Sequence, residues 1–210
     1  MDGKRVIILA GGIGSGKSHV SSYIREKTAA TVIDTDRVAK ELMAPGQPGF
    51  ERTVNLFGPR TVAADGTLDR GYLADCIYRD EAARRALNAA IHPAVRSEVA
   101  RLIDAADTAV VIVETALAFE AGLDSLGDEL WAVDVDEATR IRRLKTHRGM
   151  DTERAVAIMA AQMDSADLAA RADVVIRNDD GTAFQAAVDA ALGRREDDSE
   201  DTEFNQRQQR

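Results

Sequence analysis

The sequence predicts an α/β protein with three layers, in which helices cover both faces of a five-stranded parallel sheet. Five short runs of apolar and β-branched residues are nearly continuous rather than alternating, which is typical of strands buried on both faces. Longer segments with helical periodicity separate these runs, and helices that connect parallel strands imply right-handed crossovers. The predicted strands are Arg5–Ala10, Ala30–Ile33, Val110–Glu114, Trp131–Val135 and Val174–Ile176.

Two of the connections are longer than a crossover requires. The connection between the second and third predicted strands has no convincing strand of its own, and Pro45-Gly46 and Asp65-Gly66 mark turns within it. A second helical excursion, Glu137–Ala170, is rich in arginine where it begins. The helices predicted in the first excursion are Arg37–Met43, Gly49–Leu56, Arg70–Tyr78, Glu81–Ile91 and Pro93–Asp104.

These segments predict a single domain over residues 1–193, built from a core, a helical insertion and a helical lid. The core consists of residues 1–36, 105–136 and 171–193. The insertion consists of residues 37–104, and the lid consists of residues 137–170. The acidic and polar tail at 194–210 has almost no apolar content. We expect this tail to be disordered, because it cannot bury enough surface to offset the entropy of ordering it.

The composition indicates an ordinary globular protein. With 210 residues, of which 45% are hydrophobic, the chain can form a full core without a metal or disulfides. The lone cysteine, Cys76, excludes an intramolecular disulfide and fits a reducing cytosol. The longest early apolar run, Val6–Ala10, is far too short for a signal or membrane segment. The formal net charge of −9 argues against nucleic acid as a general partner, because phosphate-backbone binding needs concentrated Lys and Arg. We therefore expect a cytoplasmic protein that binds neither nucleic acid nor membranes.

Between the first strand and the next helix, the sequence satisfies G-x-x-x-x-G-K-[ST], the pattern of a phosphate-binding loop. Glycines let the backbone turn tightly and point N–H groups at phosphate oxygens, and the following helix directs its positive dipole end at the anion. Lys17 can reach the β- and γ-phosphates, and the hydroxyl of Ser18 can ligate Mg²⁺. The predicted nucleotide-binding residues of the loop are Gly11, Gly12, Ile13, Gly14, Ser15, Gly16, Lys17 and Ser18.

A protein that binds a nucleotide in such a loop can belong to one of three functional classes. These are a GTPase-like switch, a mechanical ATPase and a small-molecule kinase. The sequence has no Asn-Lys-x-Asp stretch, which a guanine reader would need, and the apolar run ending at Glu114 has one acid rather than adjacent acids. A kinase needs an acceptor-binding module and a means of excluding water. The two helical excursions fit these needs and favour a kinase; a kinase for another small metabolite and a nucleotide-binding regulatory protein are the alternatives.

Two acids follow the second predicted strand, at the edge of the sheet where open α/β folds bind ligands. The carboxylate of Asp34 or Asp36 can accept a proton from an attacking hydroxyl or hold Mg²⁺. The alternative is structural, with Asp36 capping a helix that begins at Arg37. Spacing alone does not choose between the two acids.

A cluster of arginines follows the fourth predicted strand. Phosphoryl transfer spreads negative charge over equatorial oxygens, which a guanidinium can stabilise. Arg140 and Arg143 lie one turn apart on one helical face, and Arg148 precedes Gly149 at a bend where a lid could hinge. The alternative for any single arginine is a solvated helix face. The cluster comprises Arg140, Arg142, Arg143, Arg148 and Arg154.

With these residues in view, the sequence resembles the dephospho-CoA kinases, the enzymes of the last step of coenzyme A synthesis. The resemblance spans roughly residues 5–190, and its most discriminating pieces are DGTLDR at 65–70 and IHP at 91–93. The other matching pieces are GGIGSGKS, VIDTDRVAKEL, PGQPGF, LAFE, RGM, Gln162 and ADVVIRN.

The resemblance implies a P-loop kinase fold and ATP-dependent phosphorylation of the ribose 3′-hydroxyl of dephospho-CoA, with Mg²⁺ held by Ser18 and Asp34. It also implies Asp36 as the favoured base with Asp34 as the alternate, and Lys17 and Arg148 as groups acting on the transferring phosphoryl. We further expect a monomer or a weak homo-oligomer. The residues implied near the nucleotide, besides the loop, are Arg143 and Asn178, and those implied near the acceptor are Arg70, His92, Leu117, Glu120 and Arg140.

Three positions depart from the pattern of this family. Glu114 and Ala116 stand where the family usually has an aspartate and a proline, and Leu168 stands where a lysine is common. Leu168 removes one possible phosphate-binding cation, and the role of Glu114 toward Mg²⁺ is weakened. From the residues alone, His92-Pro93 predicts only a helix boundary.

Overall fold

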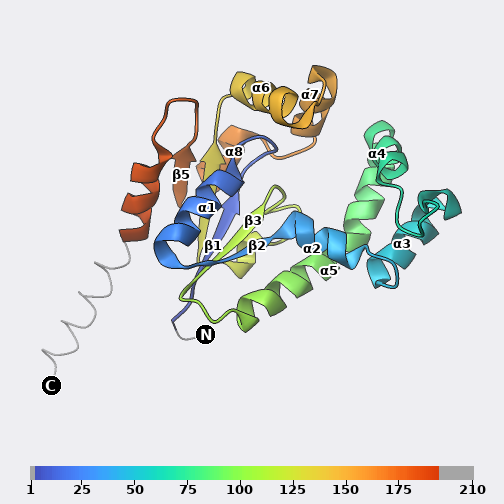
Figure 1. Ribbon diagram of the computed structural model, residues 1–210, viewed down its shortest axis with the longest axis horizontal. Coiled ribbons are helices and arrows are strands. Elements are labelled where there is room, and N and C mark those ends of the chain that lie inside the picture. Colours follow the sequence, from blue (N-terminus) through green and yellow to red (C-terminus); the bar gives the residue numbers. More distant parts are fainter. Residues whose placement is uncertain (1–2, 194–210) are drawn as a thin grey trace, which may run out of the picture. The chain divides into compact units, whose positions relative to one another are not determined.

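The computed structural model describes residues 3–193 and contains one five-stranded parallel sheet flanked by helices (Figure 1). The strand order is β2-β3-β1-β4-β5, so the predicted fold class is confirmed. The predicted disorder of residues 194–210 lies outside the described residues. The strands are β1 (Arg5–Ala10), β2 (Thr31–Asp34), β3 (Val110–Thr115), β4 (Glu129–Asp134) and β5 (Val174–Arg177).

The helices of the described chain match both predicted excursions. They are α1 (Lys17–Thr28), α2 (Thr35–Leu42), α3 (Pro48–Phe57), α4 (Arg70–Arg79), α5 (Glu81–Ala105), α6 (Glu137–Arg148), α7 (Thr152–Ala160) and α8 (Ser165–Arg171), with short 3₁₀ turns η1 (Pro59–Thr61) and η2 (Asp124–Leu126). Residues 184–193 are also helical. Over residues 3–193, no helix combines the length and the apolar character needed to cross a membrane.

The chain divides into two compact units, and the division falls within β1. The first unit contains residues 3–8 and 31–128, and the second contains residues 9–30 and 129–193. The predicted helical insertion therefore lies in the first unit, whereas the phosphate-binding loop and the predicted lid lie in the second.

The first unit is organised around α5, against which α2, α3 and α4 pack. Its buried side chains, Ile91, Val95, Val99 and Ile103, recur at helical spacing and form one apolar stripe. The predicted break at His92-Pro93 is wrong, because α5 runs through Pro93 without interruption. Proline removes one backbone hydrogen bond there, but the buried stripe continues on both sides of it and holds the helix together.

The second unit pairs β4 with β5 in parallel register, from Trp131 beside Val174 to Asp134 beside Arg177. Trp131 is fully buried and α8 packs against β4. The prediction that β5 is buried on both faces is wrong, because its side chains alternate between buried and exposed. An edge strand needs only one buried face, and this explains the alternation.

The strand boundaries differ from the prediction by one or two residues. β2 begins at Thr31 rather than Ala30 and ends at Asp34, and β4 begins at Glu129 rather than Trp131. The shift at β2 also moves the start of the next helix, because α2 begins at Thr35 rather than at Arg37. Asp34 consequently becomes the residue that precedes this helix.

Candidate functional site

The glycine loop joins β1 to α1 in a conformation that requires glycine. Gly14 and Gly16 have φ angles of 80° and 89°, a left-handed region that side chains disfavour. A Cβ atom at Gly16 would lie 2.2 Å from the side-chain amide nitrogen of Asn178. The loop therefore places the start of α1, with its inward N–H groups and positive dipole end, where an anion can bind.

Buried and half-buried polar side chains hold the backbone of this loop in place. The Asn178 amide donates to the Ser15 carbonyl at 2.7 Å, and Asn178 is only 5% exposed. The Gln162 side-chain oxygen accepts from the Ile13 N–H at 3.0 Å, and Arg140 Nε donates to the Ile13 carbonyl at 3.1 Å. All of these groups belong to the second unit, so the loop is preorganised by its own surroundings.

Arg140 is the most buried arginine of α6, with 7% of its surface exposed. Besides Ile13, it donates to Ser165 Oγ at 3.2 Å, and no carboxylate of the described residues lies within ion-pair distance of it. Burial lowers the pKa of its guanidinium, and the more distant Glu137 only partly opposes this effect. A cation in this situation suits an anionic ligand on the adjacent loop.

The position of Arg140 also bears on its predicted role. A Cβ atom at Gly12 would lie 2.0 Å from Arg140 Nη2, so the guanidinium sits directly on the loop. The resemblance assigned Arg140 to the acceptor, but the structure places it against the phosphate-binding backbone of the second unit. The expectation that it faces the acceptor stays a prediction.

Lys17 and Ser18 open α1. Lys17 Nζ donates to the carbonyls of Gly11 and Gly12 at 2.7 and 3.3 Å, which folds its side chain back over the loop. Ser18 is exposed, whereas Ser15 is 1% exposed and its hydroxyl has no hydrogen-bond partner within the described part of the chain. A phosphate group in the loop would replace the two carbonyls as the partner of Lys17.

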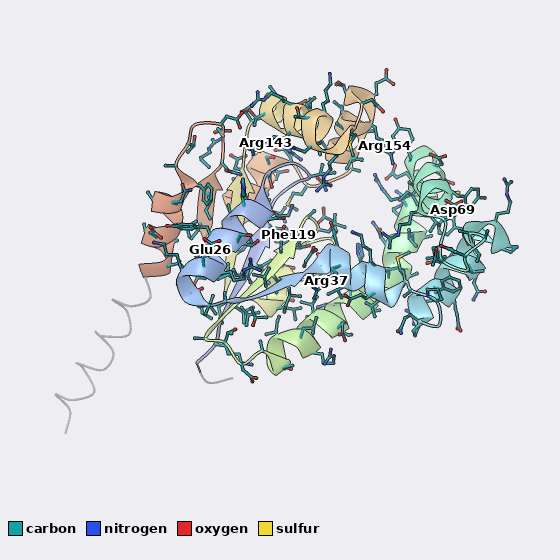
Figure 2. All side chains as sticks on the ribbon, in the orientation of Figure 1. Glu26, Arg37, Asp69, Phe119, Arg143 and Arg154 are labelled. Atoms are coloured by element: carbon teal, nitrogen blue, oxygen red, sulfur yellow. The ribbon has the colours of Figure 1, made fainter. Side chains whose placement is uncertain are left out.

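Two further arginines of α6, Arg142 and Arg143, bond to the segment after β5, and Figure 2 labels Arg143. Arg143 donates to the Asn178 carbonyl at 2.8 Å and to Asp180 at 2.9 Å, and Arg142 also contacts Asp180. Arg143 lowers the pKa of the Asp180 carboxyl through this hydrogen bond, and Arg142 adds to the effect. Arg143 and Asn178, both predicted near the nucleotide, thus lie together beside the loop. Asp180 was missed, because its role depends on a contact across 37 residues of sequence.

Arg148, the predicted lid arginine, ends α6 and is exposed. Gly149 follows with a φ angle of 59° and closes the helix, and Asp151 caps α7 through its hydrogen bond from the N–H of Arg154. The predicted bend at this point is confirmed. The exposure of Arg148 contrasts with the burial of Arg140 eight positions earlier.

In the first unit, the structure separates the roles of the two acids. Asp34 Oδ1 accepts from the backbone N–H groups of Asp36 and Arg37 at 2.9 and 3.3 Å, so Asp34 is the N-cap of α2. The interpretation of Asp36 as the cap is therefore wrong, because α2 begins earlier than predicted. Asp36 is instead one of the residues that line a pocket.

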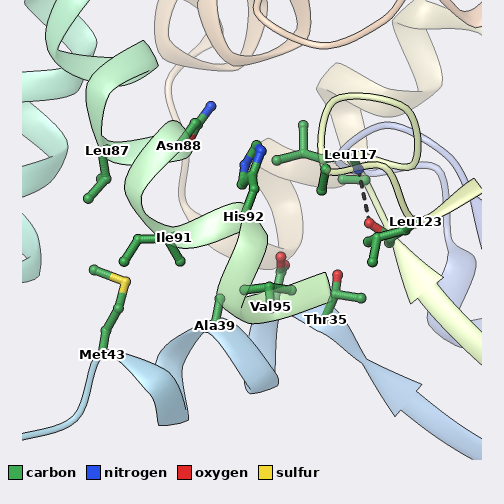
Figure 3. Close-up of a pocket in the computed structure, with 14 residues that line it drawn as sticks. Thr35, Ala39, Met43, Leu87, Asn88, Ile91, His92, Val95, Leu117 and Leu123 are labelled. Carbon is green, nitrogen blue, oxygen red and sulfur yellow. Dashed lines mark hydrogen bonds between the residues drawn. The ribbon is translucent and has the colours of Figure 1, made fainter. Parts of the chain in front are cut away.

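This pocket lies between α2, α5 and the segment that follows β3 (Figure 3), and its volume is about 160 Å³. Its polar lining comes from Asp36, His92, Asn88 and the threonines at 35 and 115, and the rest is apolar. In Figure 3, Asn88 and His92 project from one side of α5. The apolar lining residues are Ala39, Met43, Leu87, Ile91, Val95, Ala116, Leu117, Ala121 and Leu123.

The predicted acceptor residues fall partly in this pocket. His92 and Leu117 line it, and the backbone carbonyl of Glu120 lies 3.0 Å from His92 Nδ1. Arg70, which begins α4, is exposed and is not among the lining residues. Sequence reasoning missed Asn88; its spacing from His92 would have revealed the shared face if α5 had been predicted as one helix.

The three departures from the family pattern occupy ordinary places in the fold. Glu114 lies beside Asp34 in the register of β2 and β3, Ala116 lines the pocket, and Leu168 is buried on α8. A lysine at position 168 would have to extend out of this apolar site.

Comparison with known proteins gives a consistent result. The family profile described as dephospho-CoA kinase matches residues 5–183. A dephospho-CoA kinase of Symbiobacterium thermophilum is 44% identical over 177 residues, which cover 83% of this chain and 74% of that protein. A dephospho-CoA kinase of Moorella thermoacetica is 39% identical over 191 residues, 89% of this chain and 90% of that protein.

Solved structures show the same fold. The TT1252 protein of Thermus thermophilus superposes with a TM-score of 0.75 at 30% identity, over 90% of this chain and 94% of that chain. The dephospho-CoA kinase of Campylobacter jejuni, at 21% identity, superposes with a TM-score of 0.63 over 90% of this chain and 96% of that chain and supports the fold alone. The family match extends across both units, and the chain therefore belongs to the dephospho-CoA kinase family, a family of phosphotransferases.

Proposed function

We propose that this protein transfers the γ-phosphoryl group of ATP to the ribose 3′-hydroxyl of dephospho-CoA, which yields coenzyme A. The observation that carries the proposal is that Asp34 and Asp36 occupy different structural positions. Asp34 caps α2, whereas Asp36 lines a pocket, and the chain also holds a preorganised phosphate loop. Family membership supports the identity of the acceptor.

The phosphate loop and α6 supply the nucleotide side of the reaction. We assign the loop N–H groups and Lys17 to the β- and γ-phosphates, and Arg143 and Asn178 to the neighbourhood of the adenine. Lys17 already points its ammonium at the loop carbonyls, so it has only a short way to move toward a phosphate. Arg140, buried without a carboxylate partner among the described residues, adds positive charge to the same loop.

The residues present fit Mg²⁺. Residues 3–193 contain no cluster of three or more His, Cys, Asp or Glu side chains that could cage a metal ion. Magnesium bound to nucleotide phosphates needs only one or two protein oxygens, with water completing its octahedron. We assign Ser18 and Asp34 as these hard oxygen donors. When bound, the ion would neutralise developing charge on the phosphate oxygens.

On the acceptor side, Asp36 accepts the proton of the 3′-hydroxyl as that oxygen attacks the γ-phosphorus. The bond between the γ-phosphorus and its bridging oxygen breaks, and ADP leaves. Most of the acceleration comes from positioning and charge stabilisation, because phosphoryl transfer asks for little covalent chemistry from the protein. Arg148, exposed at the end of α6, is assigned to the charge on the transferring phosphoryl.

An assay of ADP release with ATP, Mg²⁺ and dephospho-CoA tests this proposal. We expect ADP formation that depends on dephospho-CoA and a product that carries the new phosphate at the 3′ position. Acceptors that lack the pantetheine arm, and shikimate as a control alcohol, should give little turnover. Turnover that is independent of the acceptor, or faster with another alcohol, would contradict the proposal.

A further inference from the structure

The hydrogen bond that His92 makes shows which of its ring nitrogens donates. Its Nδ1 lies 3.0 Å from the backbone carbonyl of Glu120, and a carbonyl oxygen can only accept a hydrogen bond. Nδ1 must therefore carry the proton of this hydrogen bond. In the neutral imidazole this leaves Nε2 as the one acceptor that the ring can offer to a ligand.

The anchoring of the loop after β3 does not depend on His92 alone. One turn further along α5, Arg96 donates to the carbonyl of Gly122 at 2.9 Å and to Ser125 Oγ at 3.2 Å. Arg96 does not line the pocket, whereas His92 does. The two side chains thus share the structural task, and only His92 also faces the space where a ligand can lie.

The polar groups of the pocket are biased toward accepting hydrogen bonds. The carboxylate of Asp36 only accepts, and Nε2 of His92 accepts, while Asn88 and the threonines at 35 and 115 can do either. The rest of the lining is apolar, so a ligand that satisfies both acceptors must bring two hydroxyl or amine donors. The 2′- and 3′-hydroxyls of a ribose form such a pair.

We propose that His92 Nε2 accepts a hydrogen bond from the ribose 2′-hydroxyl of the acceptor, while Asp36 accepts from the 3′-hydroxyl. This inference rests on the proposed function and adds a specificity that it does not require. His92 orients the ribose, so that the enzyme selects a ribose acceptor over a 2′-deoxyribose acceptor. No bond to phosphorus involves His92.

The test is a cycle of two enzymes and two acceptors, dephospho-CoA and its 2′-deoxy analogue. For the wild type, kcat/KM should be about 10- to 100-fold higher with the hydroxylated acceptor, the loss expected when a hydrogen-bonding group is left without its partner. In His92→Asn, the amide nitrogen can still donate to the Glu120 carbonyl but nothing replaces Nε2. The ratio should fall toward 1, mainly through the hydroxylated acceptor. The intrinsic effect of the 2′-hydroxyl on its neighbour cancels, because both enzymes meet the same pair of acceptors.

Three controls separate specificity from structure. Arg96→Gln removes the neighbouring anchor without touching the pocket, so its ratio should stay at the wild-type value even if its melting temperature falls. His92→Gln can place an amide oxygen near the position of Nε2 and should recover part of the ratio. Asn88→Ala should leave the ratio in place.

The outcomes that overturn the inference are distinct from those that overturn the proposed function. If the wild type uses both acceptors equally well, or if His92→Asn keeps the wild-type ratio, the inference fails while the kinase activity stands. A ratio that collapses in Asn88→Ala but not in His92→Asn would assign the 2′-hydroxyl to Asn88 and also overturn it. Absence of any turnover with dephospho-CoA would instead remove the proposed function itself.

Discussion

The phosphate loop and the pocket beside Asp36 are built on different physical principles. Three buried or half-buried polar side chains, Asn178, Gln162 and Arg140, each bond to the backbone of the loop. The pocket is mainly apolar, with a few acceptors at its wall. The protein thus fixes the anion site in advance, since charge stabilisation needs dipoles that do not reorganise. The acceptor site can rely on shape and on a small number of directed hydrogen bonds.

The largest expected effect comes from removing the cation of the loop. Lys17→Ala should lower kcat by about 10²- to 10³-fold, because the charge that meets the β- and γ-phosphates is lost. The ADP-release assay measures this change. Lys27→Ala is the matched control on the same helix, since Lys27 pairs with Asp189 at 3.6 Å on the surface. If Lys17→Ala keeps near-normal turnover, the loop does not act through preorganised charge, and it does not differ in this respect from the pocket.

The second test addresses the acid in the pocket. Asp36→Asn should lower kcat by about 100-fold, the lower end expected for a lost general base, with little change in the KM for ATP. Asp34→Asn should keep its fold, because asparagine caps a helix as well as aspartate does. If Asp34→Asn loses kcat and Asp36→Asn does not, the base has been assigned to the wrong acid.

The loop was predictable from the sequence because its constraints are local. Glycine spacing, the preceding apolar run and Lys17 all lie within one short stretch, and the structure confirms the strand, the loop and the helix that follows. The choice between Asp34 and Asp36 was not predictable, since it depends on whether α2 begins at Thr35 or two residues later. Helix ends are set by competing caps, and the sequence offers both acids as candidates.

The features that escaped prediction depend on distant contacts. The continuity of α5 through Pro93 follows from burial of its apolar stripe, which outweighs the local tendency of proline to end a helix. The close approach of the Arg140 guanidinium to Gly12 brings together residues that are far apart in the sequence. A cluster of arginines in the sequence predicts anion binding, but only the packing of the folded chain decides which arginine is buried.

A third test uses Arg140 to separate charge from packing in the loop region. Arg140→Met should weaken ATP binding about tenfold or more, because a partly desolvated cation beside the phosphates is lost. Its unfolding free energy should change by no more than about 1 kcal/mol, since removing a buried charge offsets the loss of its hydrogen bonds. ATP titration calorimetry and denaturant unfolding measure the two quantities.

Asn178→Ala is the counterpart to Arg140→Met in the same region. It leaves the Ser15 carbonyl without its buried amide donor, and should cost about 1–2 kcal/mol of stability. If Arg140→Met destabilises the protein more than Asn178→Ala does, Arg140 holds the loop rather than serving the nucleotide.

The smallest effect concerns the anchor between α6 and the segment after β5. The pKa of Asp180 lies below its usual value of 3.8 because Arg143 donates a hydrogen bond to the carboxylate. A depressed carboxylate pKa in the folded state stabilises the protein above the unfolded pKa, and this contribution is lost as the pH falls through the folded pKa. Asp180→Asn should therefore lower the melting temperature slightly at pH 7, and the difference from the wild type should shrink as the pH drops below about 4. High salt at pH 7 should shrink it as well, because the pair is exposed to solvent. If the melting-temperature difference is the same at every pH and salt concentration, Asp180 stabilises the second unit through packing rather than through its charge. Asn178 would then be the last residue of this segment that holds the nucleotide region by polar contacts.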